Sequence, residues 1–301
     1  METRPLGDTG LTVSALGFGA GGIGGEDLTD REVMTLLHRV VDAGLTLIDT
    51  ARSYGRSEER IGRLLADRRD ELVLSTKVGY LVEGHEDWTG PCVAAGIDRA
   101  LTMLGTDRID IVHLHSCDAE TLQRDDILTA LDDARAAGKI RARAYSGEND
   151  ALAAAIATGA FESLQCSLSV CDPANIRGPD GGAIGRGAEL GLGVIVKRSL
   201  GNAVWRFHDC PVGRDEELYW RRREALELAA IEQESGLAPG ELALRFAAFE
   251  PGVSSALVAT RSPAHLAENL AALARGPLPA GVRAAVACRH AEHAVDWPGH
   301  I

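Results

Sequence analysis

Four polar side chains stand at or just after the ends of apolar runs in this chain. Asp49 ends LTLID, Lys77 ends LVLSTK, His115 ends IDIVHLH, and Tyr54 follows Asp49 by five residues. A phenol holds its proton too tightly at neutral pH to be an efficient donor. A buried ammonium nearby stabilises the phenolate, and a carboxylate offsets the charge of that ammonium. With an imidazole to orient the acceptor, such a set could protonate a carbonyl oxygen.

Each of these residues alone has an ordinary structural interpretation. An aspartate before a helix is often an N-cap, a lysine is usually solvated, and a strand histidine usually packs in the core. Asp, Lys and His at three consecutive strand ends, with a tyrosine near the first, form a coherent acid-base set. We therefore treat Asp49, Tyr54, Lys77 and His115 as candidate catalytic residues.

Eight short apolar runs separated by helix-periodic segments must position these residues. The candidate strands cover residues 14–19, 45–50, 72–77, 109–115, 140–146, 163–168, 193–199 and 255–260. Alternation of this kind predicts a (β/α)8 TIM barrel, in which the carboxyl ends of all strands meet at one rim. An open doubly wound sheet is the alternative, and it is disfavoured because no G-x-G-x-x-G follows the first strand.

Two segments exceed the eightfold repeat. Residues 215–236 and 280–294 have helical patterns of their own, and we expect two extra helices there and a β-hairpin at the N-terminus. The chain contains no Pro/Ser-rich linker and no low-complexity tract, so residues 1–301 are predicted to form a single domain.

Composition narrows the classes of partner and compartment. No run approaches the roughly 18 apolar residues of a membrane span, and METRPLGDTG does not resemble a signal peptide, so a cytoplasmic protein without membrane contact is expected. The net charge of −13 disfavours a nucleic-acid partner, because phosphates would be repelled. The six cysteines include no C-x-x-C pair, which disfavours a zinc or disulfide framework.

Four motifs in one order resemble the aldo-keto reductases, which are NAD(P)H-dependent barrel enzymes. They are LIDTARSYGRSEERIG, LSTKVG, RIDIVHLH and GKIRARAYSG, and the resemblance extends from RPLGDTGLTVSALGFG to RSPAHLAENLAAL. The resemblance implies hydride transfer to a small-molecule aldehyde or ketone. It makes Tyr54 the proton donor in reduction, with Lys77 and Asp49 tuning it and His115 positioning the carbonyl.

The resemblance also implies residues for the nicotinamide end of the cofactor. The family's Ser-Asn pair is Ser146-Gly147 here, so the asparagine's hydrogen bond is lost or supplied elsewhere, with Asn149 as a substitute. Gln165 matches the glutamine that binds the same amide. Gly19, in the glycine-rich stretch after the first strand, is also expected at the cofactor.

The segment VIVKRSLGN corresponds to the middle of the cofactor. Lys197 or Arg198 falls where other members carry an aromatic residue, and either cation could meet the nicotinamide or the pyrophosphate. The alternative is a salt bridge at the rim. Backbone amides of Ser199, Leu200 and Gly201 are expected to wrap the pyrophosphate.

The adenosine end is implied in ATRSPAHLAEN. Thr260, Arg261 and Ser262 precede a helix whose N-terminus favours an anion such as a 2′-phosphate. His265 stands where the family has an arginine, while Glu268 and Asn269 match the pair that contacts adenine. NADP(H) is therefore favoured, and NAD(H) is possible.

Three aromatic residues could contact the substrate. Trp88, Trp205 and Phe207 lie in expected rim loops and are candidate substrate contacts.

A metal-dependent barrel hydrolase would use His113 and His115, two apart on one strand face, but would need further ligands. A cofactor-sensing binding subunit on the same fold is the other alternative.

Overall fold

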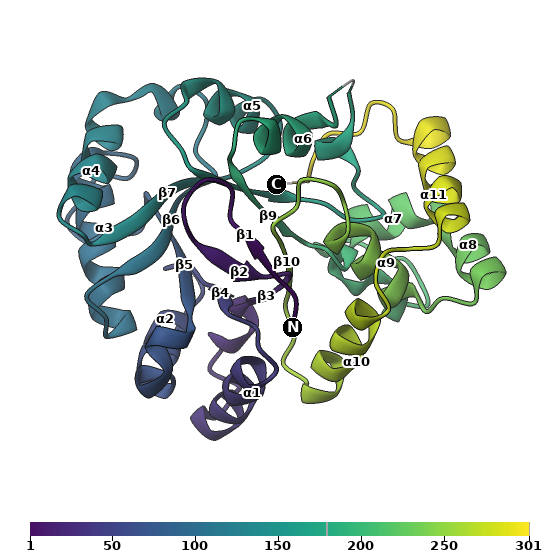
Figure 1. Ribbon diagram of the computed structural model, residues 1–301, viewed down its shortest axis with the longest axis horizontal. Helices are drawn as coiled ribbons and strands as arrows, with labels where there is room; N and C mark the ends of the chain where they lie inside the picture. The colour runs from purple at the N-terminus through teal and green to yellow at the C-terminus, as the bar shows by residue number, and fades with distance from the viewer. Residues whose placement is uncertain (179, 301) are drawn as a thin grey trace.

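Eight parallel strands close into a barrel in the computed structural model, which describes residues 1–178 and 180–300. Their order around the barrel is β10-β3-β4-β5-β6-β7-β8-β9, which confirms the predicted (β/α)8 fold and excludes the open sheet (Figure 1). The strands are β3 (Leu16–Gly19), β4 (Leu47–Asp49), β5 (Val73–Val78), β6 (Ile109–His115), β7 (Ile140–Ser146), β8 (Ser163–Ser167), β9 (Gly193–Lys197) and β10 (Ser255–Val258).

Helices surround the barrel as an outer ring (Figure 1). The eight that alternate with the strands are α1 (Asp30–Asp42), α2 (Ser57–Leu64), α3 (Gly90–Leu104), α4 (Asp125–Ala136), α5 (Asn149–Thr158), α6 (Gly182–Glu189), α9 (Pro239–Ala248) and α10 (Pro263–Ala274). The others are α7 (Glu217–Ala225), α8 (Leu228–Ser235) and α11 (Ala280–His293).

The stretch predicted as one helix over 215–236 is two helices, α7 and α8. Glu227 between them has φ of 49°, in the left-handed region, which ends the first helix. Leu226 and Leu228 are both buried, although residues two apart lie on opposite sides of one helix. The break therefore lets α7 and α8 both turn an apolar face to the core.

An antiparallel hairpin of β1 (Thr3–Pro5) and β2 (Thr12–Ser14) closes the amino-terminal end of the barrel, as expected for the N-terminus (Figure 1). Its Leu6, Leu11 and Val13 are buried in one cluster with inward-facing strand residues, among them Ile111 and Ile195. The bottom of the barrel is thus filled with apolar side chains, which leaves the opposite end for chemistry.

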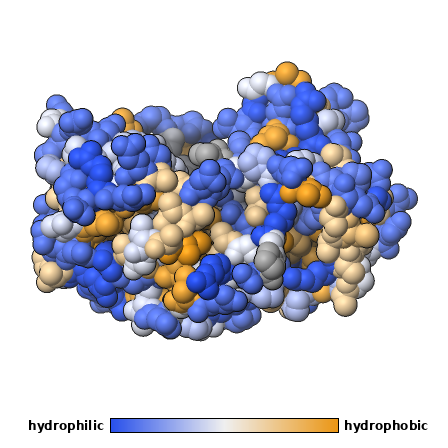
Figure 2. Space-filling view, turned by 90° about the horizontal axis from the view of Figure 1, so that it is seen from above, coloured by the Kyte–Doolittle hydropathy of each residue, from blue (hydrophilic) through white to orange (hydrophobic). Residues whose placement is uncertain are grey.

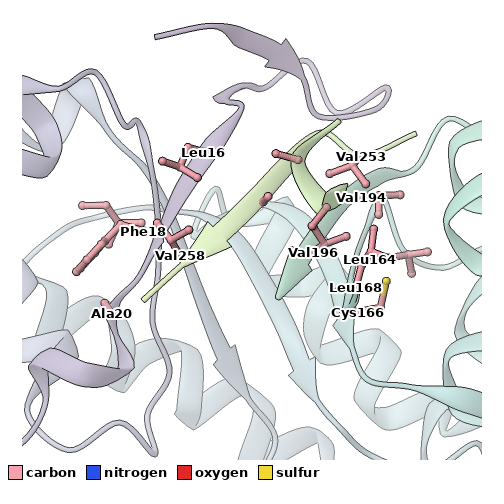
Figure 3. Packing of buried hydrophobic residues seen from close by; sticks show 14 of the residues in the cluster. Leu16, Phe18, Ala20, Leu164, Cys166, Leu168, Val194, Val196, Val253 and Val258 are labelled. Atoms are coloured by element: carbon pink, nitrogen blue, oxygen red, sulfur yellow. The ribbon is translucent and has the colours of Figure 1, made fainter. Parts of the chain in front are cut away.

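Period-two alternation along the strands separates an outer layer from the interior. Leu16 and Phe18 of β3 and Val194 and Val196 of β9 belong to the large cluster that also includes the buried helix residues (Figure 3). Residues of the opposite parity face inward, so polar residues at these positions are presented to the barrel interior. On β6 the inward-facing residues are Ile111, which belongs to the apolar cluster at the amino-terminal end of the barrel, and then residues 113 and 115, each closer to the carboxyl ends of the strands.

Hydrophilic residues cover most of the face in Figure 2, with hydrophobic residues in small groups. None of the helices in residues 1–178 and 180–300 combines the length and apolarity that crossing a bilayer requires.

Candidate active site

The four candidate catalytic residues come together at the carboxyl ends of the strands. Asp49, Tyr54, Lys77 and His115 all line one cavity of about 560 Å³. Lys77 Nζ donates to Asp49 Oδ2 at 2.6 Å and lies 5.0 Å from the centre of the Tyr54 ring. The rings of Tyr54 and His115 meet nearly at right angles, with centroids 6.2 Å apart.

Tyr54 reaches this rim because two loops pack tightly together. The Arg56 amide donates to the Gly24 carbonyl at 3.1 Å, and a Cβ at Gly24 would lie 1.7 Å from the Tyr54 carbonyl oxygen. Ser57 Oγ donates to the Ala20 carbonyl at 2.9 Å. The loop after β4 is therefore fixed against the loop after β3, and only glycine allows this approach at position 24.

The Lys77–Asp49 pair is buried, with 2% and 3% of the two residues exposed. Burial, the largest single effect, would raise the pKa of the Asp49 carboxyl, but the Lys77 ammonium together with His113 and the Ser75 hydrogen bond lowers the pKa overall. Burial, the largest single effect, would lower the pKa of Lys77, but the Asp49 carboxylate and Tyr54 together raise the pKa overall. Each ion therefore keeps the other charged at neutral pH, which maintains a buried ammonium next to the phenol.

Asp49 is held in place by a hydrogen-bond network of Ser75, Gln165 and His113, of which Ser75 was not predicted from the sequence. Its Oδ1 accepts from Ser75 Oγ and from Gln165 Nε2, each at 2.8 Å. Ser75 Oγ also lies 3.0 Å from His113 Nε2, and since the single Ser75 proton goes to the carboxylate, His113 must donate from Nε2. Burial lowers the pKa of His113 to about 3, so this imidazole is neutral. The signal for Ser75 was its position two residues before Lys77, on the same strand face.

His115 has a partner that the sequence interpretation did not name. Its Nδ1 lies 2.9 Å from the hydroxyl of Tyr80, three residues after Lys77. Burial, followed by the charge of Lys77, lowers the pKa of His115 to about 3. The imidazole at the mouth is therefore neutral, and it can act on a carbonyl as a hydrogen-bond donor rather than as a cation.

The candidate cofactor residues divide between two adjoining cavities. The first cavity is lined by Gly19, Ser146, Gln165, Lys197, Arg198, Ser199 and Leu200. A second, of about 950 Å³, is lined by Leu200, Thr260, Arg261, Ser262, His265, Glu268 and Asn269. Leu200, Ala203, Arg206 and Ala259 line both, so the two cavities form one elongated trough.

The two cations at the carboxyl end of β9, Lys197 and Arg198, already have partners. Lys197 Nζ lies 3.1 Å from Glu148 Oε1, and burial, only partly offset by this carboxylate, lowers the pKa of Lys197. Arg198, with φ of 55°, donates to Ser167 Oγ and to the carbonyl oxygen of His300. The salt bridge considered as the alternative for this pair is thus present at Lys197, while the partners of Arg198 among residues 1–178 and 180–300 are neutral oxygen acceptors.

The segment that supplies the His300 carbonyl packs on the rim through hydrogen bonds to the exposed Asn149 and to the buried Asp172 and Arg222. Asn149 exchanges two hydrogen bonds with the backbone of Gly299, at 3.1 and 2.7 Å. The His300 amide donates to Asp172 at 3.0 Å, and Arg222 donates to the Pro298 carbonyl at 2.7 Å. The Asn149 amide considered as a substitute for the family asparagine is therefore engaged with this segment.

Two predicted cofactor residues line neither cavity. A Cβ at Gly147 would lie 2.2 Å from the hydroxyl of Tyr145, which explains why this position cannot carry the family's asparagine. The Gly201 amide donates to the Arg198 carbonyl at 2.7 Å, so it is not available to wrap a pyrophosphate. Arg261, at the far end of the trough, donates to Asp27 at 2.5 Å.

None of the three candidate substrate residues lines the catalytic cavity. Trp88 stands behind Tyr80, with ring centroids 5.5 Å apart. Trp205 lines the second cavity instead. The guanidinium carbons of Arg206 and Arg214 lie 4.8 and 4.9 Å from the centre of the Phe207 ring. Tyr80 is the aromatic residue that contacts His115 from the loop after β5, with ring centroids 5.4 Å apart.

Within residues 1–178 and 180–300, no three His, Cys, Asp or Glu side chains are grouped as they would be to hold a metal ion. His113, the first histidine of the two-apart pair, contacts Ser75.

Comparison with known proteins gives consistent matches. Residues 15–287 match the family model described as Aldo/keto reductase family. The chain is 26% identical over 281 residues to a 6-dehydroglucose reductase of Novosphingobium aromaticivorans, covering 90% of each chain. It is 32% identical over 163 residues to a D-threo-aldose 1-dehydrogenase of a Pseudomonas species, covering 44% of this chain and 50% of that one. The solved holo aldo-keto reductase of Bacillus halodurans superposes with a TM-score of 0.83 at 24% identity, covering 96% of both chains.

Proposed function

Because the chain belongs to the aldo/keto reductase family, we propose that it reduces a small-molecule aldehyde or ketone to an alcohol with a nicotinamide cofactor, Tyr54 being the general acid. The observation that carries this proposal is the buried Lys77–Asp49 ion pair, which holds an ammonium 5.0 Å from the ring centre of Tyr54 in the same cavity as His115.

The proton step follows from these contacts. The carbonyl oxygen binds between Tyr54 and His115, and Tyr54 donates its proton to that oxygen as negative charge develops there. Lys77 stabilises the phenolate that remains, and Asp49 keeps the Lys77 ammonium charged in its buried position. In the oxidative direction the same phenolate accepts the alcohol proton.

The trough fits an extended dinucleotide. When bound, the nicotinamide cofactor supplies the hydride that reduces the carbonyl carbon. Ser146 and Gln165 line the first cavity, where the Ser146 hydroxyl donates to Gln165 Oε1 at 2.9 Å, and we assign this pair to the nicotinamide amide. Arg198 lines the same cavity and contributes positive charge there. In the second cavity, Ser262 caps the N-terminus of α10, where a helix favours an anion.

NADP(H) is the favoured cofactor, with NAD(H) accommodated. Arg261 is the cation that lines the second cavity beside the start of α10, next to the predicted 2′-phosphate position. The imidazole of His265 lies on the exposed first turn of the same helix. Since Arg261 is shared with Asp27, a 2′-phosphate must compete with a carboxylate for it.

The test is NADPH and NADH consumption with a panel of aldehydes, ketones and keto-sugars, the last included because two relatives are named for sugar substrates. Tyr54→Phe should lose about 10²- to 10⁴-fold in kcat while cofactor affinity is unchanged. Tyr145→Phe is the matched control, because it removes a phenol hydroxyl that donates to the Cys117 carbonyl instead. Cofactor binding without turnover in the wild type would indicate a binding subunit, and parental activity in Tyr54→Phe would refute the assigned acid.

A further inference from the structure

Tyr80 makes the closest polar contact to the catalytic histidine in the described part of the chain. Its hydroxyl lies 2.9 Å from His115 Nδ1, and the two ring planes are tilted by 30° with centroids 5.4 Å apart. Tyr80 follows β5 in the loop toward α3, so it approaches His115 from the neighbouring strand. This contact leaves Nε2 as the ring nitrogen that His115 can offer to a ligand in the cavity.

The loop after β5 is folded so that Tyr80 has little freedom. Gly79 has φ of +127°, and a Cβ there would lie 2.1 Å from the Trp88 ring. The Trp88 amide donates to the Gly79 carbonyl at 2.7 Å, which folds the loop back on itself. The Tyr80 ring is then packed between Trp88 and His115, with centroid distances of 5.5 and 5.4 Å. Trp88 thus acts on the site through Tyr80.

Proton counting limits how this contact can be arranged. A neutral imidazole carries one N–H, so either Tyr80 donates to Nδ1 and the proton is on Nε2, or Nδ1 donates to Tyr80 and Nε2 is bare. The hydroxyls of Ser53 and Tyr80 lie 3.3 Å apart. The single Tyr80 proton therefore has two acceptors within reach, Ser53 Oγ at 3.3 Å and His115 Nδ1 at 2.9 Å. The shorter contact favours Nδ1, and with the Tyr80 proton directed there, Ser53 can donate to the Tyr80 oxygen.

We propose that Tyr80 is a positioning residue that holds His115 in the tautomer protonated at Nε2, so that His115 donates a hydrogen bond to the substrate's carbonyl oxygen. The inference rests on the proposed function for its catalytic meaning. A carbonyl oxygen is an acceptor only, so a bare Nε2 would repel it and leave Tyr54 as its single donor. Tyr80 makes the donating arrangement the favoured one before substrate arrives, which is preorganisation of an electrostatic site.

The test compares Tyr80→Phe, which keeps the ring and removes the hydroxyl, with Tyr145→Phe, which removes a phenol hydroxyl bonded to the Cys117 carbonyl. Tyr80→Phe should lower kcat/KM for the carbonyl substrate about five- to tenfold, the value of one ordinary hydrogen bond, with cofactor affinity unchanged. Tyr145→Phe should keep the parental kcat/KM. Ser53→Ala, at an exposed position, should lower kcat/KM in the same direction by a smaller factor.

A spectroscopic measurement decides the tautomer independently of turnover. In protein labelled with ¹⁵N-histidine, the His115 signals are identified by their absence in His115→Gln. The wild type should show a protonated Nε2 and a hydrogen-bonded, unprotonated Nδ1, and Tyr80→Phe should shift the Nδ1 signal. A wild-type Nδ1 that carries the proton would overturn the inference even in an active enzyme. A wild type with the expected tautomer but no carbonyl turnover would overturn the proposed function instead.

Discussion

The substitution Asp49→Asn removes the charge of the proposed catalytic carboxylate and keeps its shape. The network around it can reverse direction, because the amide nitrogen introduced at position 49 would donate to Ser75 Oγ and to a flipped Gln165 amide while the new amide oxygen faces Lys77. Ser75 would then donate to His113 Nε2, which accepts in its other tautomer. Every hydrogen bond can survive the substitution, so its effect reports the missing negative charge.

The size of that effect follows from burial. Lys77 is 2% exposed and would keep only neutral acceptors, the new amide oxygen at position 49 and the Thr50 carbonyl at 2.9 Å. Removing one partner of a buried ion pair costs roughly 3–5 kcal/mol in stability if the remaining charge persists. If Lys77 instead releases its proton, the cost falls but the phenol loses its neighbouring cation. In either case kcat should fall about 10²- to 10⁴-fold, the usual contribution of an acid catalyst.

The assay pairs urea unfolding with pre-steady-state cofactor oxidation, and Asp110→Asn is the matched control. Asp110 is 1% exposed and accepts from Arg69 at 2.8 Å and Arg141 at 3.1 Å, near the start of β6 and far from the mouth. Asp110→Asn should lose comparable stability and keep its rate of hydride transfer. The reasoning is refuted if Asp49→Asn reduces carbonyls at the parental rate, or if both variants slow equally.

Two further predictions concern pH and cofactor choice. Burial holds the pKa of His113 and His115 at about 3, below the roughly 6.5 of an unfolded histidine, so the unfolded state binds more protons below about pH 6.5 and stability falls toward acid. At about pH 5.5 each of these histidines lowers the free energy of unfolding by roughly 1.4 kcal/mol. Urea unfolding at neutral pH and at about pH 5.5 should show that His113→Gln loses less stability on acidification than the wild type does. An equal loss in the two proteins would contradict this. Asp27→Asn releases Arg261 from its carboxylate and should tighten NADPH but not NADH binding in fluorescence titrations, whereas an unchanged ratio would mean that Arg261 does not meet the 2′-phosphate.

The parts of the site that were predictable from sequence are those set by strand alternation. Asp49, Lys77 and His115 end apolar runs, and in a closed parallel barrel all such ends meet at one rim. The same alternation places Ser75 and His113 one step deeper, although their mutual hydrogen bond depends on the register of β5 and β6. Local pattern and barrel geometry together thus determine the core of the site.

The unpredicted parts depend on backbone conformations and distant segments. Tyr80 reaches His115 because Gly79 and Trp88 both adopt positive φ, and no short-range pattern specifies that fold of the loop. Arg198 was expected to face a ligand, but its carbonyl partner on His300 lies 102 residues later in the chain. The helix break at Glu227 likewise follows from which faces of α7 and α8 the core can cover.

The hydrogen bond from Arg198 to the His300 carbonyl couples one wall of the cavity to a segment that is outside the barrel repeat. Local melting of residues 294–300 would free Arg198 while all eight strands remain paired. Peripheral segments open at a lower free-energy cost than a barrel core. On heating, the protein should therefore lose its activity at a lower temperature than the one at which the barrel unfolds. Its inactivation temperature then reports the docking of residues 294–300, and its calorimetric midpoint reports the barrel.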